Sequence, residues 1–428
     1  MTETYAPTTY APTTDDQVRD LIAWAFAEKA PLEIIGRGSK RDLGNPMAEA
    51  EGNLATLDLS ALAGVGLYEP GELVLTAAPG TPMAEIDALL AEHNQRLAFE
   101  PMDMGLVLGG PADAGTLGGM ISCNLAGPRR ISAGAARDHI LGVKGVTGRG
   151  ENFKSGGRVV KNVTGYDMSK LMTGAYGTLG AMTELSIKVL PVPEKAWTVL
   201  VFGLDDAAAI RALAQAAGSR HEVSGLAHLP ASAAAKSGVG YVASSAASVT
   251  AIRLEGPGPS VEYRAAALKE ELKSFGEVEE LHSKNTGDLW REIRDVRLLD
   301  ADAVLWRLSV APSAGAAVVA DIRQRLGEQK SEVTYDWQGG LIWLAPGGGQ
   351  DPAVDAVRGA VDAVGGHATL IRAPIEARRA ASVFHPQAPA LAALSRRLKD
   401  ALDPHGVFNP GRLAANGQGR IAANGSGG

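Results

Sequence analysis

Pro111-Ala-Asp-Ala-Gly-Thr-Leu-Gly-Gly-Met120 is the stretch of sequence that decides the fold. From Gly115 to Asn124 this stretch is rich in glycine and small residues, whose missing side chains let backbone N–H groups approach a bound anion closely. A second glycine loop, Gly36 to Gly44, follows the short apolar run Leu32 to Ile35, a pattern typical of a buried strand that ends in a turn. Two separate loops of this kind suit the clamping of one diphosphate.

Neither loop has the form of the common nucleotide-binding motifs. Arg41 occupies the third glycine position after the pair Gly36 and Gly38, so the dinucleotide fingerprint of a Rossmann fold is absent. The chain also has no Gly-Lys dipeptide, which excludes the P-loop. Glycines in one loop can serve tight turns alone, so only the two loops together favour a cofactor clamp.

Composition limits the kinds of partner and site that the chain can have. Its 428 residues are enough for two or three domains, and its 41 basic and 48 acidic residues form no long run of one sign, so no nucleic-acid surface is indicated. The single cysteine, Cys123, excludes a disulfide framework and any iron–sulfur or zinc site built from several cysteines of this chain. No two histidines lie closer than seven residues, so we expect no local metal site, although distant residues can converge.

The two ends of the chain differ in composition from the rest. Residues 1–14 contain a repeated YAPTT, and the stretch from Ala414 onward is rich in small and polar residues, so both ends are expected to be flexible tails. The first residues have neither a basic start nor an apolar run, and no stretch reaches the ~18 apolar residues of a membrane span. We therefore expect a cytoplasmic location, with membrane contact only peripheral, at the inner face of the cell membrane, or through a partner.

Periodicity predicts the first elements. Apolar residues at helical spacing predict a helix between Asp15 and Ala30. Glu72 to Ala78 is expected to be a strand, and the next helix is expected to have Thr81 as its N-cap and Pro82 as its first residue.

The middle of the chain is glycine-rich. From Gly105 to Gly180 we expect few helices and short strands such as Ile140 to Thr147 and Glu184 to Leu190, an α+β region and not a run of βαβ units. Pro191-Val192-Pro193 then indicates a domain boundary.

Beyond this boundary the pattern has ferredoxin-like order, β-α-β-β-α-β. The predicted elements are Val304 to Ser309, an alanine-rich helix to about Leu326, Val333 to Trp337, Leu341 to Leu344, a helix near Val354 to Val364, and Ala368 to Arg372. Strands near Val199 and Ile252 and a helix near Tyr263 to Phe275 can add to the same sheet, which predicts a cap of roughly 180 residues.

The motifs in this order resemble the vanillyl-alcohol-oxidase type of FAD domain and, more specifically, the FAD-binding subunits of bacterial glycolate oxidases. The stretches that carry the resemblance are Pro111 to Met120, Asn124-Leu-Ala-Gly-Pro-Arg-Arg130, Gly157-Arg-Val-Val-Lys-Asn-Val-Thr-Gly-Tyr-Asp-Met168, Tyr176-Gly-Thr-Leu-Gly-Ala-Met-Thr-Glu184 and Asp403-Pro-His-Gly-Val-Phe-Asn-Pro-Gly-Arg412. It covers about Asp15 to Leu413 and is strongest from Gly105 to Pro193.

The resemblance implies an α+β fold with a two-part FAD-binding domain, a ferredoxin-like cap, and a C-terminal return to the FAD domain. The boundaries expected are 1–14 for the N-terminal tail, 15–193 for the FAD-binding domain, 194–384 for the cap, 385–413 for the return, and 414–428 for the C-terminal tail.

It also implies a set of FAD-binding residues. They are Gly36, Arg37, Gly38, Ser39, Lys40, Arg41, Gly115, Thr116, Leu117, Gly118, Gly119, Ser122, Asn124, Arg137, Thr178, Leu179, Gly180, Met182 and Asn409, of which the group from Thr178 to Met182 is expected to face the isoalloxazine. Arg129, Arg130 and Arg137 either offset phosphate charge or pair at the surface. Because the Gly36 loop has no histidine, FAD is expected to be bound noncovalently, with Cys123 as the residue to check.

The catalytic residues are not evident. The His-x-His element of related catalytic dehydrogenases is absent; His385 and His405 suggest turn or helix-end roles, whereas Asn409 and Arg412 either close over the flavin or cap a helix. The resemblance implies a subunit of a complex that oxidises glycolate to glyoxylate, beside a paralogous catalytic flavoprotein and an iron–sulfur subunit. Two alternatives stay open. One is a self-sufficient 2-hydroxy-acid oxidoreductase, which converging cap arginines or histidines would favour, and the other is a scaffold stiffened by FAD without redox turnover.

Overall fold

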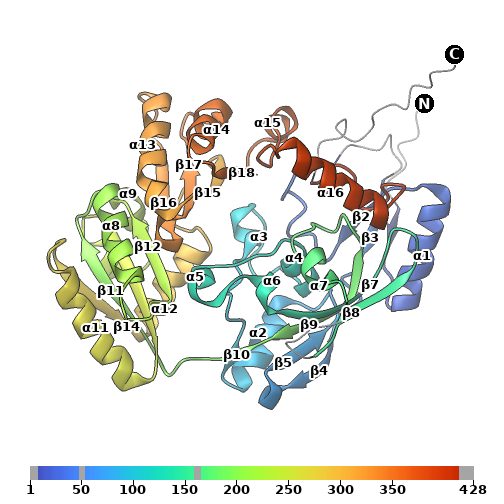
Figure 1. The fold of residues 1–428 in the computed structure, drawn as a ribbon, viewed down its shortest axis with the longest axis horizontal. Coiled ribbons are helices and arrows are strands. Elements are labelled where there is room, and N and C mark those ends of the chain that lie inside the picture. The colour runs from blue at the N-terminus through green and yellow to red at the C-terminus, as the bar shows by residue number, and fades with distance from the viewer. Residues whose placement is uncertain (1–7, 48–53, 159–164, 414–428) are drawn as a thin grey trace.

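The computed structural model describes residues 8–47, 54–158 and 165–413. Figure 1 shows two groups of elements side by side, the N-terminal group on the right and a larger sheet on the left, with the C-terminal helix α16 (Pro389–Leu402) lying back over the N-terminal group. None of the described helices is both long enough and apolar enough to cross a bilayer.

The N-terminal group contains two main sheets and a set of short helices. Its strands are β1 (Thr9–Tyr10), β2 (Leu32–Ile35), β3 (Ala55–Asp58), β4 (Val65–Glu69), β5 (Val74–Ala77), β6 (Gln95–Arg96), β7 (Ile140–Val146), β8 (Asn152–Gly156), β9 (Ala181–Lys188) and β10 (Leu190–Pro191). Its helices are α1 (Asp15–Glu28), η1 (Pro70–Glu72), α2 (Met83–Glu92), α3 (Met104–Val107), α4 (Leu117–Ser122), α5 (Arg130–Ala133), α6 (Ala136–His139) and α7 (Met168–Met172).

The first sheet is parallel, in the order β1-β3-β2, and the second is antiparallel, in the order β4-β5-β9-β7-β8. Helix α1 joins them: Val18, Ile22 and Ala25 recur at helical spacing, are fully buried, and pack with residues of β2, β3, β7 and β9. Phe408 of the C-terminal segment enters the same core and lies beside Leu32 of β2. The sequence therefore predicted the first helix and strand β2 correctly.

Three expectations for this group are wrong. The chain up to Thr14 was expected to be a tail, but Thr9–Tyr10 pair with β3 and the Thr14 hydroxyl accepts the Gln17 N–H at the start of α1; only residues 1–7 of that stretch lie outside the described residues. Thr81 is not an N-cap, because its hydroxyl bonds Gly64 and the Ala78 carbonyl across the preceding turn. The glycine-rich region was expected to have few helices, but its described residues, which exclude 159–164, contain five, each of four to six residues.

The second group is one eight-stranded sheet in the order β14-β11-β13-β12-β16-β17-β15-β18. Its strands are β11 (Lys195–Phe202), β12 (Gly225–Leu229), β13 (Val249–Gly256), β14 (Val278–His282), β15 (Leu305–Ser309), β16 (Glu332–Asp336), β17 (Leu341–Ala345) and β18 (His367–Arg372). Its helices are α8 (Asp206–Ala217), α9 (Ala231–Ala234), α10 (Gly240–Ala243), α11 (Gly258–Leu272), α12 (Ser283–Arg294), η2 (Pro312–Ala314), α13 (Gly315–Leu326), η3 (Trp337–Gly339), α14 (Val354–Asp362) and α15 (Ile375–Ala380).

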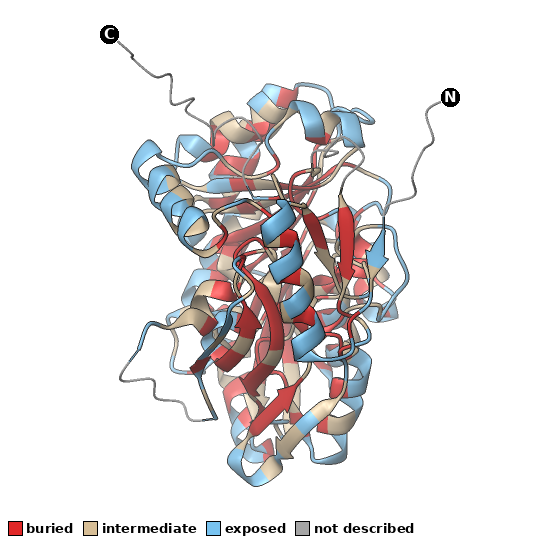
Figure 2. Cartoon of the chain, turned by 90° about the vertical axis from the view of Figure 1, so that its right-hand side faces the viewer, coloured by how far each residue is buried: buried red, intermediate tan, exposed pale blue. Residues whose placement is uncertain are grey.

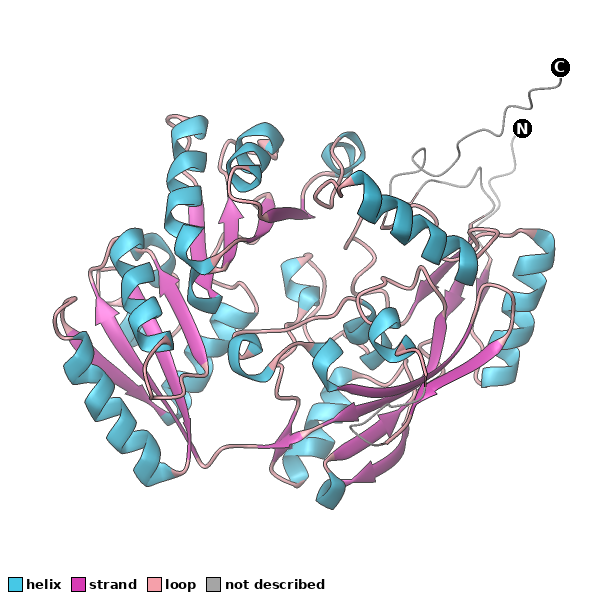
Figure 3. Ribbon diagram, viewed as in Figure 1, coloured by secondary structure: helices cyan, strands magenta, loops and turns pink. Residues whose placement is uncertain are grey.

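This sheet consists of two β-α-β-β-α-β units, β11 to β14 and β15 to β18, joined where His228 of β12 pairs with Tyr335 of β16. Within each unit the fourth strand lies beside the first, and the third lies between the first and the second, which is ferredoxin-like order. The prediction of one such unit, with an earlier stretch added to the same sheet, is confirmed. Figure 3 shows helices flanking the strands of both units. The helices α9, α10 and α12 pack on the opposite face of the first unit from α8 and α11.

The two faces of the sheet have different partners. The outer face packs against α8, α11, α13 and α14 in one large core. On the inner face, Leu305, Trp343 and Ile371 belong to the same core as residues of α2, α4 and β9 in the N-terminal group. Figure 2 shows that strands in the interior are mostly buried whereas helices on the periphery expose their outer sides. The inner face of the second ferredoxin-like unit therefore forms a wall against the N-terminal group.

Buried charges also join the two groups. The guanidinium of Arg253 on β13 donates two hydrogen bonds of 3.0 Å to the carboxylate of Glu100, and Arg129 donates bonds of 2.8 and 2.9 Å to both oxygens of Glu255. Arg96 donates to Glu255 as well. Buried ion pairs of this kind fix a unique arrangement more than they add net stability. Of the two roles expected for Arg129, these bonds favour ion pairing: its guanidinium pairs with Glu255 between the two groups of elements and does not face a phosphate site.

Candidate cofactor site

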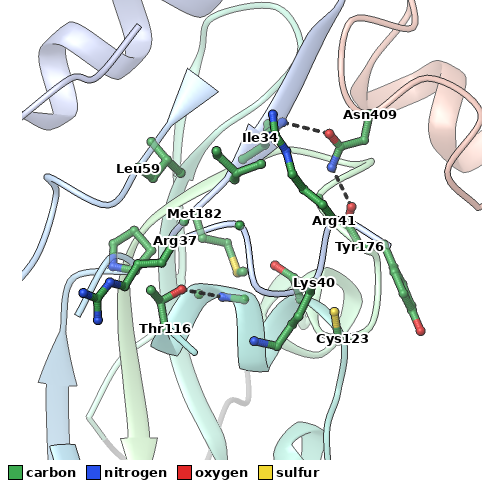
Figure 4. Close-up of a pocket in the computed structure, with 18 of the residues that line it drawn as sticks. Ile34, Arg37, Lys40, Arg41, Leu59, Thr116, Cys123, Tyr176, Met182 and Asn409 are labelled. Atoms are coloured by element: carbon green, nitrogen blue, oxygen red, sulfur yellow. Dashed lines mark hydrogen bonds between the residues drawn. The ribbon is translucent and has the colours of Figure 1, made fainter. Parts of the chain in front are cut away.

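A cavity lies where the end of β2, the start of α4 and the turn before β9 meet. Its empty volume is about 760 Å³, including the space at its open mouth, a size typical of small-molecule and cofactor sites. Thirteen of the predicted cofactor-binding residues line it: Gly36, Arg37, Gly38, Ser39, Lys40, Arg41, Thr116, Gly118, Gly119, Ser122, Gly180, Met182 and Asn409. The structure therefore brings both glycine loops and the turn before β9 to one place, as Figure 4 shows.

The two glycine loops touch each other. A Cβ atom at Gly36 would lie 2.6 Å from the Oγ1 atom of Thr116, closer than real Cβ contacts allow. Thr116 is the N-cap of α4, and its Oγ1 accepts the N–H of Gly119. A Cβ at Gly118 would lie 2.7 Å from the Cβ of Pro79. Glycine is therefore needed at both positions for the loops to close around one side of the cavity.

Lys40 places an ammonium group between the loops. Its Nζ lies 3.4 Å and 3.5 Å from the Cβ positions built at Gly115 and Gly119, and it donates to the Ser39 hydroxyl. No carboxylate of the described chain forms an ion pair with it. Burial lowers the pKa of Lys40, because the charged form loses its water, while Cys123 and Asp103 act weakly in the opposite direction. A desolvated cation beside two glycine loops is suited to an anionic group such as a diphosphate.

Arg41 and Arg412 have a different role. Both guanidinium groups pair with the buried carboxylate of Glu33, and Arg412 also donates 2.8 and 3.0 Å bonds to the carbonyl oxygens of Arg41 and Leu43. These bonds hold the Gly36 loop to the C-terminal segment. The two arginines therefore shape the cavity wall, and their charge is already balanced in part by Glu33.

The opposite wall is tied together by Asn409. Its side-chain oxygen accepts the Ile34 N–H at 2.8 Å, and its Nδ2 donates to the Tyr176 carbonyl at 2.8 Å (Figure 4). A Cβ at Gly177, which has a φ of +66°, would lie 2.7 Å from this Nδ2. One amide thus joins β2, the turn before β9 and the C-terminal segment, so the return of the chain completes the cavity.

Cys123 also lines the cavity. Burial raises the pKa of its thiol to about 11, so the thiol stays protonated at neutral pH and is a poor nucleophile. Among the cavity-lining residues of the described chain there is no histidine. A histidine or a reactive cysteine, the residue types expected for covalent attachment of a flavin, is therefore not found among the described residues of this wall.

Six predicted residues do not line the cavity. Leu117 and Leu179 are buried in the core beneath it, and Gly115 lies beside Lys40 without reaching the cavity surface. The Thr178 hydroxyl bonds the Ala175 carbonyl. The remaining two support each other: Asn124 Oδ1 accepts the Arg137 N–H at 3.0 Å, while the Arg137 side chain is exposed and donates to the Lys170 carbonyl.

Eight residues that line the cavity are outside the predicted set of FAD-binding residues: Ile34, Ile35, Leu59, Pro79, Cys123, Tyr176, Gly177 and Arg412. Two of them, Cys123 and Arg412, had been named as residues near the flavin without being assigned to that set. Ile34 and Ile35 directly precede the Gly36 loop, and Tyr176 and Gly177 begin the turn before β9, so neighbourhood alone was a usable signal for these four. Leu59 and Pro79 come from separate strands and had no such signal.

The histidines do not form a metal site. Among the residues that the structure describes, no group of three or more histidine, cysteine, aspartate or glutamate side chains is placed to hold a metal ion. His385 receives the Ala368 N–H and pairs with Asp362 on α14, whereas the His405 ring packs on Phe26. Both histidines thus hold segments together.

The residues present fit FAD. The cavity offers a half-buried cation with no acidic partner among the described residues, glycines that expose the backbone on two loops, and an apolar end with Met182 and Ile34, which matches a ligand with a diphosphate and an aromatic ring. The observation that carries the fit is Lys40, because its ammonium group is half-buried and a ligand anion would supply the counter-ion that the described residues do not.

Comparisons with known proteins agree with this fit. The family described as "FAD binding domain" matches residues 7–156. The glycolate oxidase subunit GlcE of Escherichia coli is 35% identical over 393 residues, which cover 91% of this chain and 95% of that protein. The glycolate oxidase subunit GlcD of Bacillus subtilis is 29% identical over 190 residues, which cover 44% of this chain and 38% of that protein.

Solved structures share the fold. p-Cresol methylhydroxylase with bound substrate has a TM-score of 0.69 at 14% identity, over 95% of this chain and 88% of that one. Alkyldihydroxyacetonephosphate synthase has a TM-score of 0.67 at 16% identity, over 94% of this chain and 75% of that one. With near-complete coverage by GlcE and a cavity suited to the cofactor, the chain is an FAD-dependent oxidoreductase that belongs to the family of GlcE-type subunits of glycolate oxidase.

Proposed function

We propose that the chain is the FAD-binding subunit of a multi-subunit glycolate oxidase, which oxidises glycolate to glyoxylate. The single observation that carries this proposal is the 35% identity to the E. coli GlcE subunit over nearly the full length of both chains. The cavity between the two glycine loops supports it, because the cofactor expected for that reaction fits there. When bound, FAD can accept two electrons and release them one at a time.

Residues of the cavity wall would hold the cofactor by distinct contacts. Lys40 would neutralise part of the diphosphate charge, and the backbone N–H groups around Gly38 would donate to its oxygens, whereas the N–H groups of Gly118 and Gly119 already donate to the Pro79 carbonyl and the Thr116 hydroxyl. Gly180 and Met182 would contact the ring system. With no histidine in the described wall and a protonated Cys123, the proposed attachment is noncovalent.

The rest of the complex follows from what this chain lacks. One cysteine cannot ligate an iron–sulfur cluster, which needs several, so electrons would leave through an iron–sulfur subunit. A paralogous flavoprotein of the GlcD type would be the second flavin subunit. We place this hetero-oligomer in the cytoplasm, with any membrane contact peripheral or through a partner.

The proposed domain division follows the two groups of elements. Residues 15–193 would form the FAD-binding domain, 194–384 the cap, and 385–413 the segment that returns to the FAD-binding domain. Asn409 and Phe408 support the return, since both contact β2.

The function is tested by anaerobic visible spectra of the FAD-loaded chain with glycolate, alone and with the GlcD-type and iron–sulfur partners. Bleaching of the flavin band in the complex alone supports an electron-relay subunit. Bleaching in the isolated chain would establish a complete active site here and overturn the division of labour. A flavin that stays oxidised in both cases would leave only the scaffold role.

A further inference from the structure

Two arginines flank one tryptophan ring at the junction of the two groups. The Arg130 guanidinium lies 4.9 Å from the centre of the Trp337 ring, and the Arg307 guanidinium lies 5.1 Å from it. Neither forms an ion pair or a side-chain hydrogen bond with any acidic residue of the described chain. Two positive charges thus meet at one place without a counter-ion.

The sheet points Arg307 toward the N-terminal group. Arg307 is the middle residue of β15, between Trp306 and Leu308, which are fully buried in the outer core under the helices. Because neighbouring residues of a strand point to opposite faces, Arg307 lies on the inner face. It pairs there with Trp343 of β17, whose side chain belongs to the core shared with the N-terminal group.

Trp337 is held in place as the ring over which both guanidinium groups lie. Its backbone has a φ of +50°, and the next residue, Gln338, has a φ of +65°, a conformation that is unfavourable for side chains of this size. Asp336 accepts the Trp337 N–H at 2.7 Å, and the indole Nε1–H donates to the Gly127 carbonyl at 3.1 Å. The indole is thus held from both groups, and backbone strain of this kind collects at ligand-binding sites.

The place is next to the cofactor cavity. Burial lowers the pKa of Arg307 to about 10, an effect that the nearby Tyr176 hydroxyl opposes and Arg130 adds to. Tyr176 itself lines the cavity. On the other side, His367 of β18 has its pKa lowered, first by burial and then by the charge of Arg307. The uncompensated charge therefore lies between the cap sheet and the wall of the FAD cavity.

We propose that Arg307 and Arg130 bind the carboxylate of a small 2-hydroxy acid beside Tyr176, so that this chain contains a substrate-binding site of its own. The planar fork of a guanidinium matches a carboxylate through two parallel hydrogen bonds, and an anion would supply the counter-charge that the protein lacks. The substrate class rests on the proposed function; the anion site rests only on the geometry of the two arginines.

Isothermal titration calorimetry on the FAD-loaded chain tests the site. Glycolate is expected to bind, and glycolamide, which has the same shape without the charge, is expected not to bind. Arg307→Gln should weaken glycolate binding about ten- to hundredfold, since it removes a charge-assisted bond, and Arg307→Lys should recover part of the loss. Arg130→Gln should weaken binding less. Arg211→Gln, an exposed arginine on the outer helix α8, is the matched control and should bind as the wild type does.

Three outcomes overturn the proposal: equal affinity of Arg307→Gln and wild type, glycolamide binding as strongly as glycolate, or preference for inorganic phosphate over glycolate. If Arg307→Gln does not fold, the glycolate affinities of Arg130→Gln and Arg307→Lys test the proposal in its place. Flavin content and thermal midpoint, recorded for each variant, separate loss of the site from loss of the fold. A chain that keeps its flavin and assembles but binds no carboxylate refutes this inference alone, whereas a chain that binds no FAD refutes the proposed function.

Discussion

Replacement of Gly36 by alanine is the sharpest perturbation of the cofactor cavity. The new Cβ would lie 2.6 Å from the Thr116 Oγ1 and 3.2 Å from its Cγ2. The φ of Gly36 is not in the left-handed region, so backbone strain does not contribute. The effect therefore comes from the clash, which must push the Thr116 side chain away from the Gly119 N–H that it caps.

The size of the effect can be worked from its parts. Overpacking of this kind costs about 1–3 kcal/mol, and loss of an N-cap bond costs about 1 kcal/mol. Alanine also lowers the conformational entropy of the unfolded chain, which stabilises the folded state by about 0.4–1 kcal/mol. The net loss in unfolding free energy should be about 1–3 kcal/mol. If the same displacement separates the two loops around the diphosphate, FAD affinity should fall about ten- to hundredfold.

Thr116→Ala provides a double-mutant cycle. With alanine at position 116, the nearest remaining atom to the new Cβ at Gly36 is the Cβ of Ala, at 3.4 Å, an ordinary contact. The clash disappears, so the double variant should be more stable than the sum of the two single losses by about 1–2 kcal/mol. Urea unfolding gives the stability, and flavin fluorescence quenching on titration of the apoprotein gives the affinity.

Gly71→Ala is the control. Gly71 has no atom within 4 Å of a built Cβ and no positive φ, so its replacement should leave FAD affinity unchanged and should raise the free energy of unfolding by only about 0.4–1 kcal/mol, which alanine gains from the unfolded chain. A clash between Gly36 and Thr116 is ruled out if Gly36→Ala behaves like Gly71→Ala, or if the losses of Gly36→Ala and Thr116→Ala simply add.

Other predictions concern buried charges. Lys40→Met should lower FAD affinity about tenfold or more, measured by the same titration, while the apoprotein is no less stable, because the cation that is removed is half-buried and has no ion-pair partner among the described residues. Arg253→Met should cost about 1.5–3 kcal/mol in urea unfolding, because the buried Glu100 carboxylate loses two charge-assisted hydrogen bonds and keeps only its contacts with Arg129, and Glu100→Gln in the same chain should restore part of the loss. Burial raises the pKa of Asp336 from 3.8 to about 7, so the folded state holds the proton more tightly and this group's contribution to stability falls as pH rises from about 4 to about 7. Asp336→Asn should therefore gain stability relative to the wild type between about pH 5 and about pH 8; a pH-independent difference would contradict this.

The sequence predicted the elements that have clear periodicity or punctuation. Strand β2 was predicted with its bounds as the structure has them, and the second ferredoxin-like unit within one or two residues, because buried strands of four to six residues stood between glycine turns and helices. The helices between Gly105 and Gly180 were missed, since four to six residues are too few to show a helical period.

For the site, the outcome depended on how local each contact is. The Gly36 and Gly115 loops could be predicted from their glycine-rich composition, and both contribute residues to the cavity wall. The junction of Arg130, Arg307 and Trp337 joins residues far apart in the chain, and only the tertiary fold brings them together.

The most direct test of the central claim is the visible spectrum of the purified chain, before and after acid precipitation. One FAD per chain is expected, released into the supernatant when the protein precipitates, because the proposed attachment in the cavity is noncovalent. A colourless chain that cannot be reconstituted with FAD would contradict the cofactor site, and a flavin that stays with the precipitate would contradict the proposed noncovalent attachment.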